Sequence, residues 1–528
     1  MSPLSVLLVG IFFSLADGGH VLAFPGEHSH WLNMRTIIEE LVRRNHKVTV
    51  LVPDASPSVN FNSSRDAAKF NFLVFKVPFS KSDMTSWMHD FIHFSMYEAH
   101  NSSLLRRFLV PMTILSNFAQ IGMQQCEAML KNKELMETLR NSAFDVVLHD
   151  PMAPCGDLVA DILGLPLVVS MRFSFGSTLE RDCGQALLPA SYVPASPLPY
   201  SDHMAFVERL INMLMYMGTS VLSRIQWKMK IDSFYTEVKG STSSFCSSIG
   251  RAEVWLIRTF WDMETARPIQ PNFFYVGGLH CRPANQLPED LEAFMQSSGD
   301  AGVVVVTFGS MVTHLTPDRA DVIATALGRI PQKVIWRYRG ETPRTLSANT
   351  KLYDWIPQND LLGHPLTRAF VTHGGTNGLY EALFHGVPVV GIPLFGDQPD
   401  NLARLSRRGA AVVLHFNLMT VDELVEALHA VIHEPSFRSN MQRLSSLQQQ
   451  QPVAPLATAA FWVEFVMRHG GARHLRQASH DLYWFQFYSL DILAALLLTI
   501  TAGSALCWAG LHCVLWRWRW RSPTKKRD

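Results

Sequence analysis

The sequence predicts an α/β protein made of two domains, each with a parallel sheet, followed by one membrane-spanning helix. From about His20, short apolar strands alternate with helical patterns, which is typical of parallel α/β sheets. The alternation restarts near Val303, after a Pro-containing segment at 281–294. A long uncharged run then occupies 492–516. The 528 residues are enough for two domains with appendages.

The composition excludes several classes of protein. Apolar residues make up 48% of the chain and charged residues 17%, which suits large cores with some membrane-facing surface. The formal net charge of +1 argues against a nucleic-acid partner, because phosphate binding needs a clustered basic surface. The cysteines are widely spaced without a CxxC pair, which excludes a zinc ribbon and a small disulfide scaffold but leaves room for one or two disulfides. They are Cys126, Cys155, Cys183, Cys246, Cys281, Cys507 and Cys513.

The amino-terminal segment indicates a signal peptide. Residues 1–16 form an apolar block flanked by small residues around Asp17. This length fits a secretory signal better than a spanning helix, so we predict a signal peptide at 1–18. The segment carries no Lys or Arg, and a buried first strand is the alternative.

The uncharged run at 492–516 predicts a transmembrane helix. As a helix it would rise roughly 37 Å, enough to cross a hydrocarbon core of about 30 Å. Arg and Lys residues with interleaved Trp follow it, and cationic residues stay on the cytosolic side of a membrane. The body of the protein is therefore predicted on the lumenal side, with a short basic cytosolic tail.

Smaller signals agree with this topology. Lys525 and Lys526 resemble the dilysine signal that returns type I membrane proteins to the endoplasmic reticulum, although ordinary positive-inside charge explains them equally well. Asn-x-Ser sequons at Asn62 and Asn101 match lumenal exposure. We predict a single-pass glycoprotein of the endoplasmic reticulum membrane.

The N-terminal half contains several strand–helix repeats and one unusual helix. The residues at 204–230 form an apolar, Met-rich helical stretch. It could wall a ligand pocket or rest on a membrane surface, but such a stripe more often packs into a core, so we favour core packing. The other expected elements are strands at 20–24, 47–53, 144–150 and 165–170 and helices at 32–45 and 156–164.

The second half repeats the same alternation. Two such units that face each other form a cleft, and ligands bind there at the carboxyl ends of the strands. The expected strands are 303–308, 333–338, 369–373 and 388–392, with helices from about Arg319 and over 374–386.

The residues at 355–401 carry the densest chemical signal. His373, Gly374 and Gly375 end a strand and open a helix, where free amides and the helix dipole favour a diphosphate. Alone this pattern is weak, because many α/β proteins have glycine there for packing. Nearby stand residues suited to a nucleotide and a sugar: Trp355 as a stacking face for a base, Glu381 within reach of a ribose, and Asp397 and Gln398 as hydrogen-bonding groups at a strand end.

This block closely resembles the signature of UDP-glycosyltransferases, and the ends, length and spacing resemble the animal UDP-glucuronosyltransferase family over essentially the whole chain. The resemblance implies a GT-B fold of two facing Rossmann-like domains. The expected divisions are a signal peptide at 1–18, an acceptor domain at 19–283, a UDP-sugar domain at 284–450, a helical segment leading to the membrane at 451–490, a transmembrane helix at 491–516 and a tail at 517–528.

The resemblance also implies the donor contacts. Trp355 and Gln358 would contact uracil, Glu381 the ribose hydroxyls, and Asp397 with Gln398 the sugar hydroxyls. For Asp397 the alternative is a helix N-cap or turn. The diphosphate would be held by Ser310, by His373 and by the helix start that follows, at Gly375, Thr376, Asn377 and Gly378. Position 376 is Thr where many relatives have Ala.

A catalytic pair is expected from the N-terminal half. The triplet Ser29-His30-Trp31 matches the family's catalytic His, and Asp150 at a strand end matches its acidic partner. An acceptor hydroxyl is a weak nucleophile, so a His must take its proton while a carboxylate fixes the imidazole. His28 and His149 are close in sequence and could be confused with the pair. A metal site at His28 and His30 is disfavoured, because no Asp-x-Asp occurs in the chain.

The resemblance implies inverting transfer of glucuronate from UDP-glucuronate to lipophilic alcohols and phenols such as steroids and xenobiotics, a detoxification activity without a tightly bound cofactor. Arg258 matches an Arg of glucuronosyl members and suits a carboxylate or the diphosphate. The alternatives are UDP-glucose, UDP-galactose or UDP-N-acetylglucosamine as donor, or a silent regulatory homologue that forms homo- or hetero-oligomers with active relatives. A nicotinamide enzyme is discounted, because no GxGxxG follows a first strand.

Overall fold

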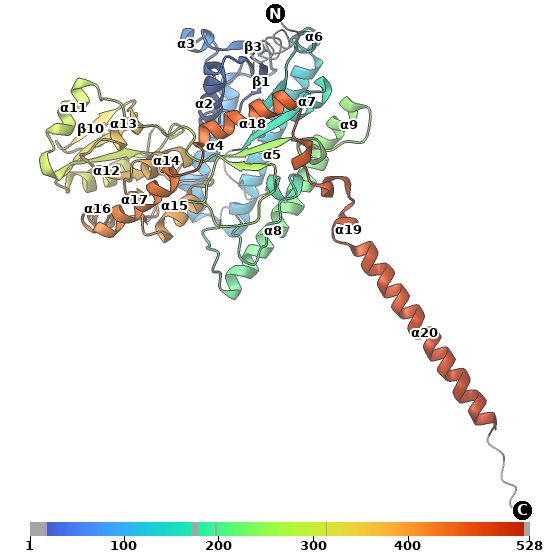
Figure 1. Cartoon of the computed structure of the whole chain (residues 1–528). Helices are drawn as coiled ribbons and strands as arrows, with labels where there is room; N and C mark the ends of the chain where they lie inside the picture. Colours follow the sequence, from blue (N-terminus) through green and yellow to red (C-terminus); the bar gives the residue numbers. More distant parts are fainter. Residues whose placement is uncertain (1–17, 172–177, 196–197, 313, 522–528) are drawn as a thin grey trace, which may run out of the picture. The chain divides into compact units, whose positions relative to one another are not determined.

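The computed structural model describes residues 18–171, 178–195, 198–312 and 314–521. The chain divides into two compact units, Met1–Leu475 and Arg476–Asp528, and Figure 1 shows their elements. The predicted signal peptide, except its last residue, and the two lysines of the tail lie outside the described residues.

The N-terminal half of the first unit is built on a seven-stranded sheet in the order β3-β2-β1-β4-β5-β6-β7. All of its strand pairs are parallel. The strands are β1 (His20–Phe24), β2 (Lys47–Pro53), β3 (Asn71–Phe75), β4 (Val146–His149), β5 (Leu167–Met171), β6 (Val254–Ile257) and β7 (Phe273–Tyr275). The helices are α2 (Ser29–Arg43), α3 (Ser64–Ala67), α4 (Lys81–His93), α5 (Leu104–Lys131), α6 (Lys133–Asn141), α7 (Gly156–Leu163), α8 (Phe206–Trp227), α9 (Ser233–Lys239) and α10 (Phe245–Ile249).

The C-terminal half is built on a six-stranded parallel sheet in the order β10-β9-β8-β11-β12-β13. The strands are β8 (Val303–Thr307), β9 (Lys333–Arg337), β10 (Thr350–Tyr353), β11 (Thr367–Thr372), β12 (Val389–Gly391) and β13 (Ala411–Val413). The helices are α11 (Glu289–Gln296), α12 (Pro317–Gly328), α13 (Gln358–Leu362), α14 (Thr376–Phe384), α15 (Gln398–Arg407), α16 (Val421–His433) and α17 (Pro435–Gln449). The predicted α/β class with two parallel sheets is confirmed.

The strand order reverses at one point in each sheet, and the candidate functional residues lie near these two points. In the first sheet β1 lies beside β4, with Phe24 opposite His149 at their carboxyl ends. In the second sheet β8 lies beside β11, with Thr307 opposite Thr372. Ligands of open α/β sheets bind at such switch points, in the crevice outside the strand ends.

Both sheets are covered on both faces, which explains the runs of apolar residues in their strands. Residues 303–306 are all Val and all fully buried. Helix α2 covers one face of the first sheet with Met34, Ile37, Ile38 and Leu41, whose spacing follows the helical repeat.

Helix α18 (Pro455–His469) returns to the first sheet (Figure 1). The ring of Trp462 stacks on Phe274 of β7 with centroids 3.9 Å apart. Glu464 accepts a hydrogen bond from Arg44, beside the end of α2, over 3.0 Å. Part of the segment that the sequence assigns to the approach to the membrane is thus a component of the N-terminal half.

Helix α8 packs into a core on one face only, so the preference for core packing holds for that face and was wrong for the apolar stripe. One face turns inward through Asn212 and Tyr216, which are almost fully buried. The opposite face carries a stripe of exposed apolar side chains at helical spacing. We call it the α8 stripe; it comprises Phe206, Leu210, Met213, Leu214, Met217, Val221 and Ile225. Periodicity revealed two faces correctly, but it does not say whether the apolar one meets protein.

The second unit contains α19 (Trp484–Phe487) and α20 (Leu490–Arg521). Among the described residues, α20 holds the one helix segment long and apolar enough to cross a membrane, Leu490–Trp520. It includes the predicted span and supports a single-pass anchor.

The N-terminal half contains two disulfides, Cys126–Cys155 and Cys183–Cys246, in agreement with the expected one or two. Cys155 precedes α7 directly, so the first disulfide ties α5 to the loop that follows β4.

We predict that replacing Cys126 and Cys155 together by Ser lowers the free energy of unfolding by about 3 kcal/mol, because the cross-link restricts the unfolded chain. Thermal denaturation of the purified chain measures the change. The matched control is Cys281→Ser, since Cys281 forms no disulfide. Equal melting of the double variant and the control would contradict the structural role of the cross-link.

Candidate functional site

His30 and Asp150, which are 120 residues apart, form a buried pair at the switch point of the first sheet. Nδ1 of His30 lies 2.8 Å from Oδ2 of Asp150. The side chain of His30 is 12% exposed and that of Asp150 only 1%. Because an ionised carboxylate only accepts hydrogen bonds, Nδ1 carries the hydrogen and Nε2 is the basic nitrogen. The expected pairing of a His with a carboxylate is present.

Arg258 completes this cluster from the end of β6. Its Nη2 lies 3.2 Å from Oδ2 of Asp150 and 3.5 Å from Nδ1 of His30, and its Nε donates to the carbonyl of Met171 over 3.1 Å. Burial alone would raise the pKa of Asp150, but His30, Arg258 and the amide of Met152 outweigh it and hold that pKa well below its usual range. Asp150 therefore stays ionised at neutral pH. Arg258 was expected among the donor contacts; here its guanidinium lies against His30 and Asp150.

A second carboxylate, Glu27, fixes the turn between β1 and α2, directly before His30. It accepts hydrogen bonds from the hydroxyl of Ser56 over 2.8 Å and from the amide of Ser58 over 3.1 Å. The backbone carbonyl of Glu27 in turn accepts from the amide of His30 over 3.0 Å. The sequence reasoning assigned no role to Glu27, and only its place between β1 and the His30 triplet hinted at one.

The two neighbouring histidines are distinguished from His30 by their positions. His149 is fully buried in β4 against the ring of Phe24, and burial lowers its pKa to about 4. His28 precedes α2 with a φ of 54°, and its amide donates to Ser58 over 2.6 Å. Of the three histidines, His30 forms the side-chain hydrogen bond to Asp150.

A cavity of about 570 Å³ opens between α2 and the carboxyl ends of the second sheet. Helix α2 supplies Ser29, Leu32 and Arg35 to its wall. All of the predicted donor residues except Arg258 and Thr376 line it. These are Ser310, Trp355, Gln358, His373, Gly375, Asn377, Gly378, Glu381, Asp397 and Gln398.

The glycines around His373 are there because the imidazole packs tightly between backbone segments. A Cβ on Gly375 would lie 2.6 Å from His373 Nε2, and one on Gly309 would meet the same ring at 2.6 Å. Gly374 has a φ of 87° and would clash with Leu402. Gly375 is the N-cap of α14, so the amides of the first helical turn face the cavity wall that the imidazole also forms.

Trp355, Gln358 and Glu381, the residues expected to contact the base and the ribose, lie together in the cavity wall. The indole of Trp355 is 67% exposed and offers an open stacking face. Nε2 of Gln358 donates to Glu381 Oε2 over 2.6 Å. Burial raises the pKa of Glu381 to about 7, although the hydrogen bond from Gln358 opposes the shift.

Asp397 stands at the N-cap position of α15, but its side chain makes no capping bond. Its Oδ2 instead accepts from Asn401 over 2.7 Å and from Thr376 over 3.1 Å. Thr376 thus supports Asp397 from behind the cavity wall. Oε1 of Gln398 accepts from the amides of Leu394 and Phe395, which leaves its amide nitrogen as a donor. This turn can offer both an acceptor and a donor to sugar hydroxyls.

Hydrogen bonds also join the two halves beside the cavity. Asn33 of α2 donates to Oδ1 of Asn377 over 3.0 Å, and Nε2 of His280 lies 3.1 Å from the carbonyl oxygen of Asn377. Sequence reasoning did not find these contacts, since nothing local marks Asn33 or His280 as partners of a residue so far along the chain.

Comparison with known proteins identifies the family. The model of the family described as UDP-glucoronosyl and UDP-glucosyl transferase matches residues 19–526. The chain is 47% identical over 506 residues to UDP-glucuronosyltransferase 2A1 of Mus musculus, covering 95% of each chain. The chain belongs to this UDP-glucuronosyltransferase family. It is also 49% identical to UDP-glucuronosyltransferase 2A2 of Homo sapiens, over 92% of this chain and 90% of that one.

Solved structures of more distant glycosyltransferases show the same fold. The calicheamicin glycosyltransferase CalG4 matches with a TM-score of 0.53 at 19% identity, over 85% of this chain and 98% of that chain. The glycotransferase of kitacinnamycin matches with a TM-score of 0.56 at 17% identity, over 85% of this chain and 99% of that chain. The fold of this UDP-glucuronosyltransferase family member is GT-B, and the resemblance inferred from the sequence is confirmed.

The raised pKa of Glu381 predicts how donor binding depends on pH. In the role expected for Glu381, ribose hydroxyls would donate to the ionised carboxylate, so binding would favour ionisation. The protonated form prevails below the pKa of about 7. We expect the affinity for UDP-glucuronate, measured calorimetrically without acceptor, to rise about tenfold from pH 6 to pH 8. In the Glu381→Gln variant the affinity should be lower and flat across this range; the same slope in both proteins would contradict the assignment.

Proposed function

We propose that this enzyme transfers glucuronate from UDP-glucuronate to a hydroxyl group of small lipophilic acceptors, with His30 as general base. The observation that carries the proposal is the hydrogen bond of His30 Nδ1 to the buried Asp150, beside a cavity lined by a nucleotide-type set of residues. The names of the similar proteins support glucuronate as the sugar.

The proposed reaction is a direct displacement. The acceptor hydroxyl gives its proton to Nε2 of His30 as its oxygen forms a bond to the anomeric carbon. The bond from that carbon to the β-phosphate oxygen breaks, and UDP leaves with the electron pair. Asp150 stays ionised and stabilises the imidazolium that forms, while Arg258 keeps the carboxylate in place. Attack from the face opposite to UDP inverts the anomeric configuration.

The departing diphosphate needs compensation for its growing negative charge. Ser310 and His373 line the cavity next to Gly375, at the start of the nine-residue helix α14. Hydroxyl, imidazole and helix amides at one place supply hydrogen bonds that strengthen as charge moves onto the leaving oxygen.

Arg258 does not belong to the wall of the cavity, which bears on how the donor sugar is recognised. Its guanidinium is 3% exposed and contacts Asp150, so its charge acts on the catalytic pair rather than on a ligand in the cavity. Recognition of glucuronate is therefore supported by the family relatives and not by an arginine in the wall. Three arginines line the cavity, Arg35, Arg282 and Arg337. Arg35 pairs with Asp66 and Arg282 with Asp360, whereas Arg337 donates to the backbone carbonyls of Gly309 and Asp354, so Arg337 is the best suited of the three to a carboxylate on the donor side.

The proposed location is the endoplasmic reticulum membrane, with the α/β halves in the lumen. Helix α20 supplies the anchor. Two disulfides are expected in an oxidising compartment, and the sequon residues Asn62 and Asn101 are exposed. We further propose that the α8 stripe rests on the bilayer surface. A membrane-anchored chain has a lipid bilayer nearby. Arg209 on α8 and Lys228, which follows its last residue, are exposed and suit lipid headgroups.

The α8 stripe can be tested with a photoactivatable phospholipid in proteoliposomes that contain the full chain. Peptide mapping should place the label on α8 as well as on α20, because apolar side chains in contact with acyl chains capture it. Helix α16, which presents charged residues such as Glu426, serves as the internal control. Label confined to α20 would show that the stripe does not meet lipid.

The catalytic proposal is tested by giving microsomes that contain the full chain a simple phenol and, separately, UDP-glucuronate, UDP-glucose, UDP-galactose and UDP-N-acetylglucosamine. Mass spectrometry should detect a glucuronide only. The His30→Ala variant should lose at least 100-fold in kcat, since a positioned base contributes about 10²–10⁴-fold, while donor affinity stays within about twofold. His28→Ala is the matched control and should keep most of the activity.

The other outcomes separate the alternatives. Product from a different donor would replace glucuronate but keep the base. Weakened donor binding in His30→Ala would mean that the role of His30 is misassigned. No product with any donor and several acceptors would favour the silent regulatory homologue.

A further inference from the structure

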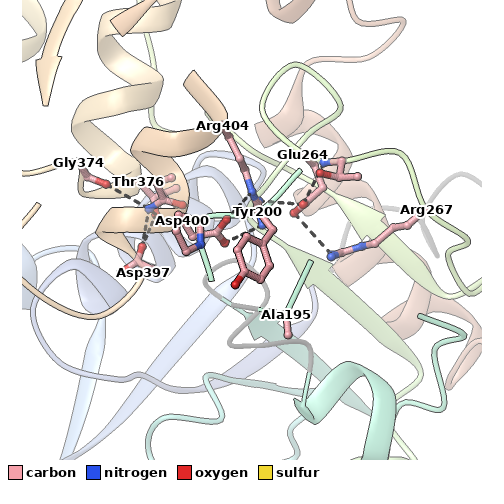
Figure 2. A network of polar contacts seen from close by, with 12 residues as sticks. Ala195, Tyr200, Glu264, Arg267, Gly374, Thr376, Asp397, Asp400 and Arg404 are labelled. Atoms are coloured by element: carbon pink, nitrogen blue, oxygen red, sulfur yellow. Dashed lines mark hydrogen bonds and ion pairs between the residues drawn. The ribbon is translucent and has the colours of Figure 1, made fainter. Parts of the chain in front are cut away.

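Helix α15 links the donor cavity to a buried network of charged side chains (Figure 2). At its start, Asp397 and Gln398 line the cavity, and Asn401 donates to the carboxylate of Asp397 over 2.7 Å. The next residues along the same helix belong to the network instead. Arg404 binds Asp400 through two hydrogen bonds, of 3.1 Å from Nε and 2.8 Å from Nη2.

Arg404 reaches across to the N-terminal half. Its Nη1 lies 2.8 Å from Oε1 of Glu264, in the segment between β6 and β7. The side chain of Arg404 is 7% exposed, and that of Glu264 is fully buried. One guanidinium thus contacts a carboxylate of each half.

The network continues inside the N-terminal half. Arg267 Nη2 lies 3.5 Å from Glu264 and 3.2 Å from Glu180, and Arg267 Nε donates to the hydroxyl of Tyr275 over 3.1 Å. Glu264 is therefore held from its own side as well as by Arg404. It also follows closely after Arg258, which contacts Asp150 from the same β6–β7 segment.

Arg407 at the end of α15 and Arg408, the C-cap residue that follows it, reinforce the joint. Arg408 Nη2 donates to the carbonyl of Glu264 over 3.1 Å, and Arg407 donates to the carbonyls of Pro199 and Tyr200. Several contacts from one helix therefore meet the N-terminal half at one place.

The buried charges favour one position of α15 against the β6–β7 segment. Burial raises the pKa of Asp400 to about 6, with Arg404 opposing the shift, and burial raises the pKa of Glu180. Buried carboxylates are tolerated here because the guanidinium groups lie between them. A buried charge that loses its partner is costly, so displacements of α15 against the β6–β7 segment are penalised.

We propose that the Arg404–Glu264 pair is a positioning element. It holds the turn at Asp397 and Gln398, which would bind the sugar, at the distance from the His30 base that the reaction needs. Arg404 and Glu264 are positioning residues and not catalytic ones. The inference rests on the proposed function, because it assigns the base to the N-terminal half and the sugar to the C-terminal half.

The rate of the reaction depends on the distance between the base and the sugar. Reacting atoms must approach to about 3–3.5 Å, and a displacement of about 1 Å can cost on the order of 100-fold in rate. The base and the sugar contacts sit on different sheets, so their distance depends on how the halves are joined. The cavity proposed to hold UDP, in contrast, is lined mainly by residues of the C-terminal half, with α2, His280 and Arg282 as the other contributors.

The test is a kinetic comparison of the full chain with Glu264→Gln, which keeps the shape and leaves the Arg404–Asp400 pair intact. We expect kcat to fall at least tenfold while the Kd for UDP changes less than twofold. The double variant Glu264→Gln/Arg404→Gln should be no slower than the slower single variant. Arg404→Lys should retain more kcat than Arg404→Gln, and its melting temperature shows whether the fold is kept.

Glu464→Gln is the matched control, because Glu464 also ties distant parts of the chain, through Arg44, but away from α15. Its kcat should stay within twofold of the parent. An unchanged kcat in Glu264→Gln, a parallel loss of UDP affinity, or additive losses in the double variant would overturn the proposal. All values are ratios to the parent with the donor that the parent uses. A wrong donor would therefore leave this test valid, whereas an inactive parent would refute the proposed function itself.

Discussion

A carboxylate buried in the core of the N-terminal half organises the site. Asp150 is 1% exposed, and an ionised group in that position is tolerated only with close partners. His30 arrives from the start of α2 and Arg258 from the end of β6, so the ends of three elements must converge on one oxygen atom. The parallel sheet supplies that convergence, because β1, β4 and β6 all end at the same edge. The hydrogen bond that anchors the fold there also orients the imidazole.

The C-terminal half uses its switch point differently. Its sheet ends present backbone amides, small residues and a turn with Asp397, which suit a charged and polyhydroxylated ligand. The same helix that begins at this turn carries Arg404 into a buried network shared with the other half. Helix α15 therefore contributes both to the proposed donor site and to the join between the halves. In the proposed mechanism the base lies on one sheet and the donor on the other, so this connection helps to set the distance between them.

Much of this arrangement could be predicted from the sequence. The strands that begin near His20 and Val303 are short apolar runs that can be recognised in the sequence. The motifs around His30 and at 355–401 are also continuous stretches of sequence. Other features depend on contacts between remote residues. Glu264 and Arg404 are 140 residues apart and resemble ordinary surface charges in the sequence, while Arg258 could be recognised as important but not placed. The exposed α8 stripe was misjudged, because helical periodicity gives the apolar face but not what covers it. The two cysteine pairs were not predicted, since spacing alone permits several pairings.

The central claim is that the acceptor attacks from the His30 side while UDP leaves on the other side, in a single displacement. The most direct measurement is the anomeric configuration of the product, determined by proton NMR on the conjugate of a simple phenol made from an α-linked UDP-sugar. The account predicts a β-linked product. An α-linked product would contradict it, because retention requires a second displacement or attack from the face that UDP occupies.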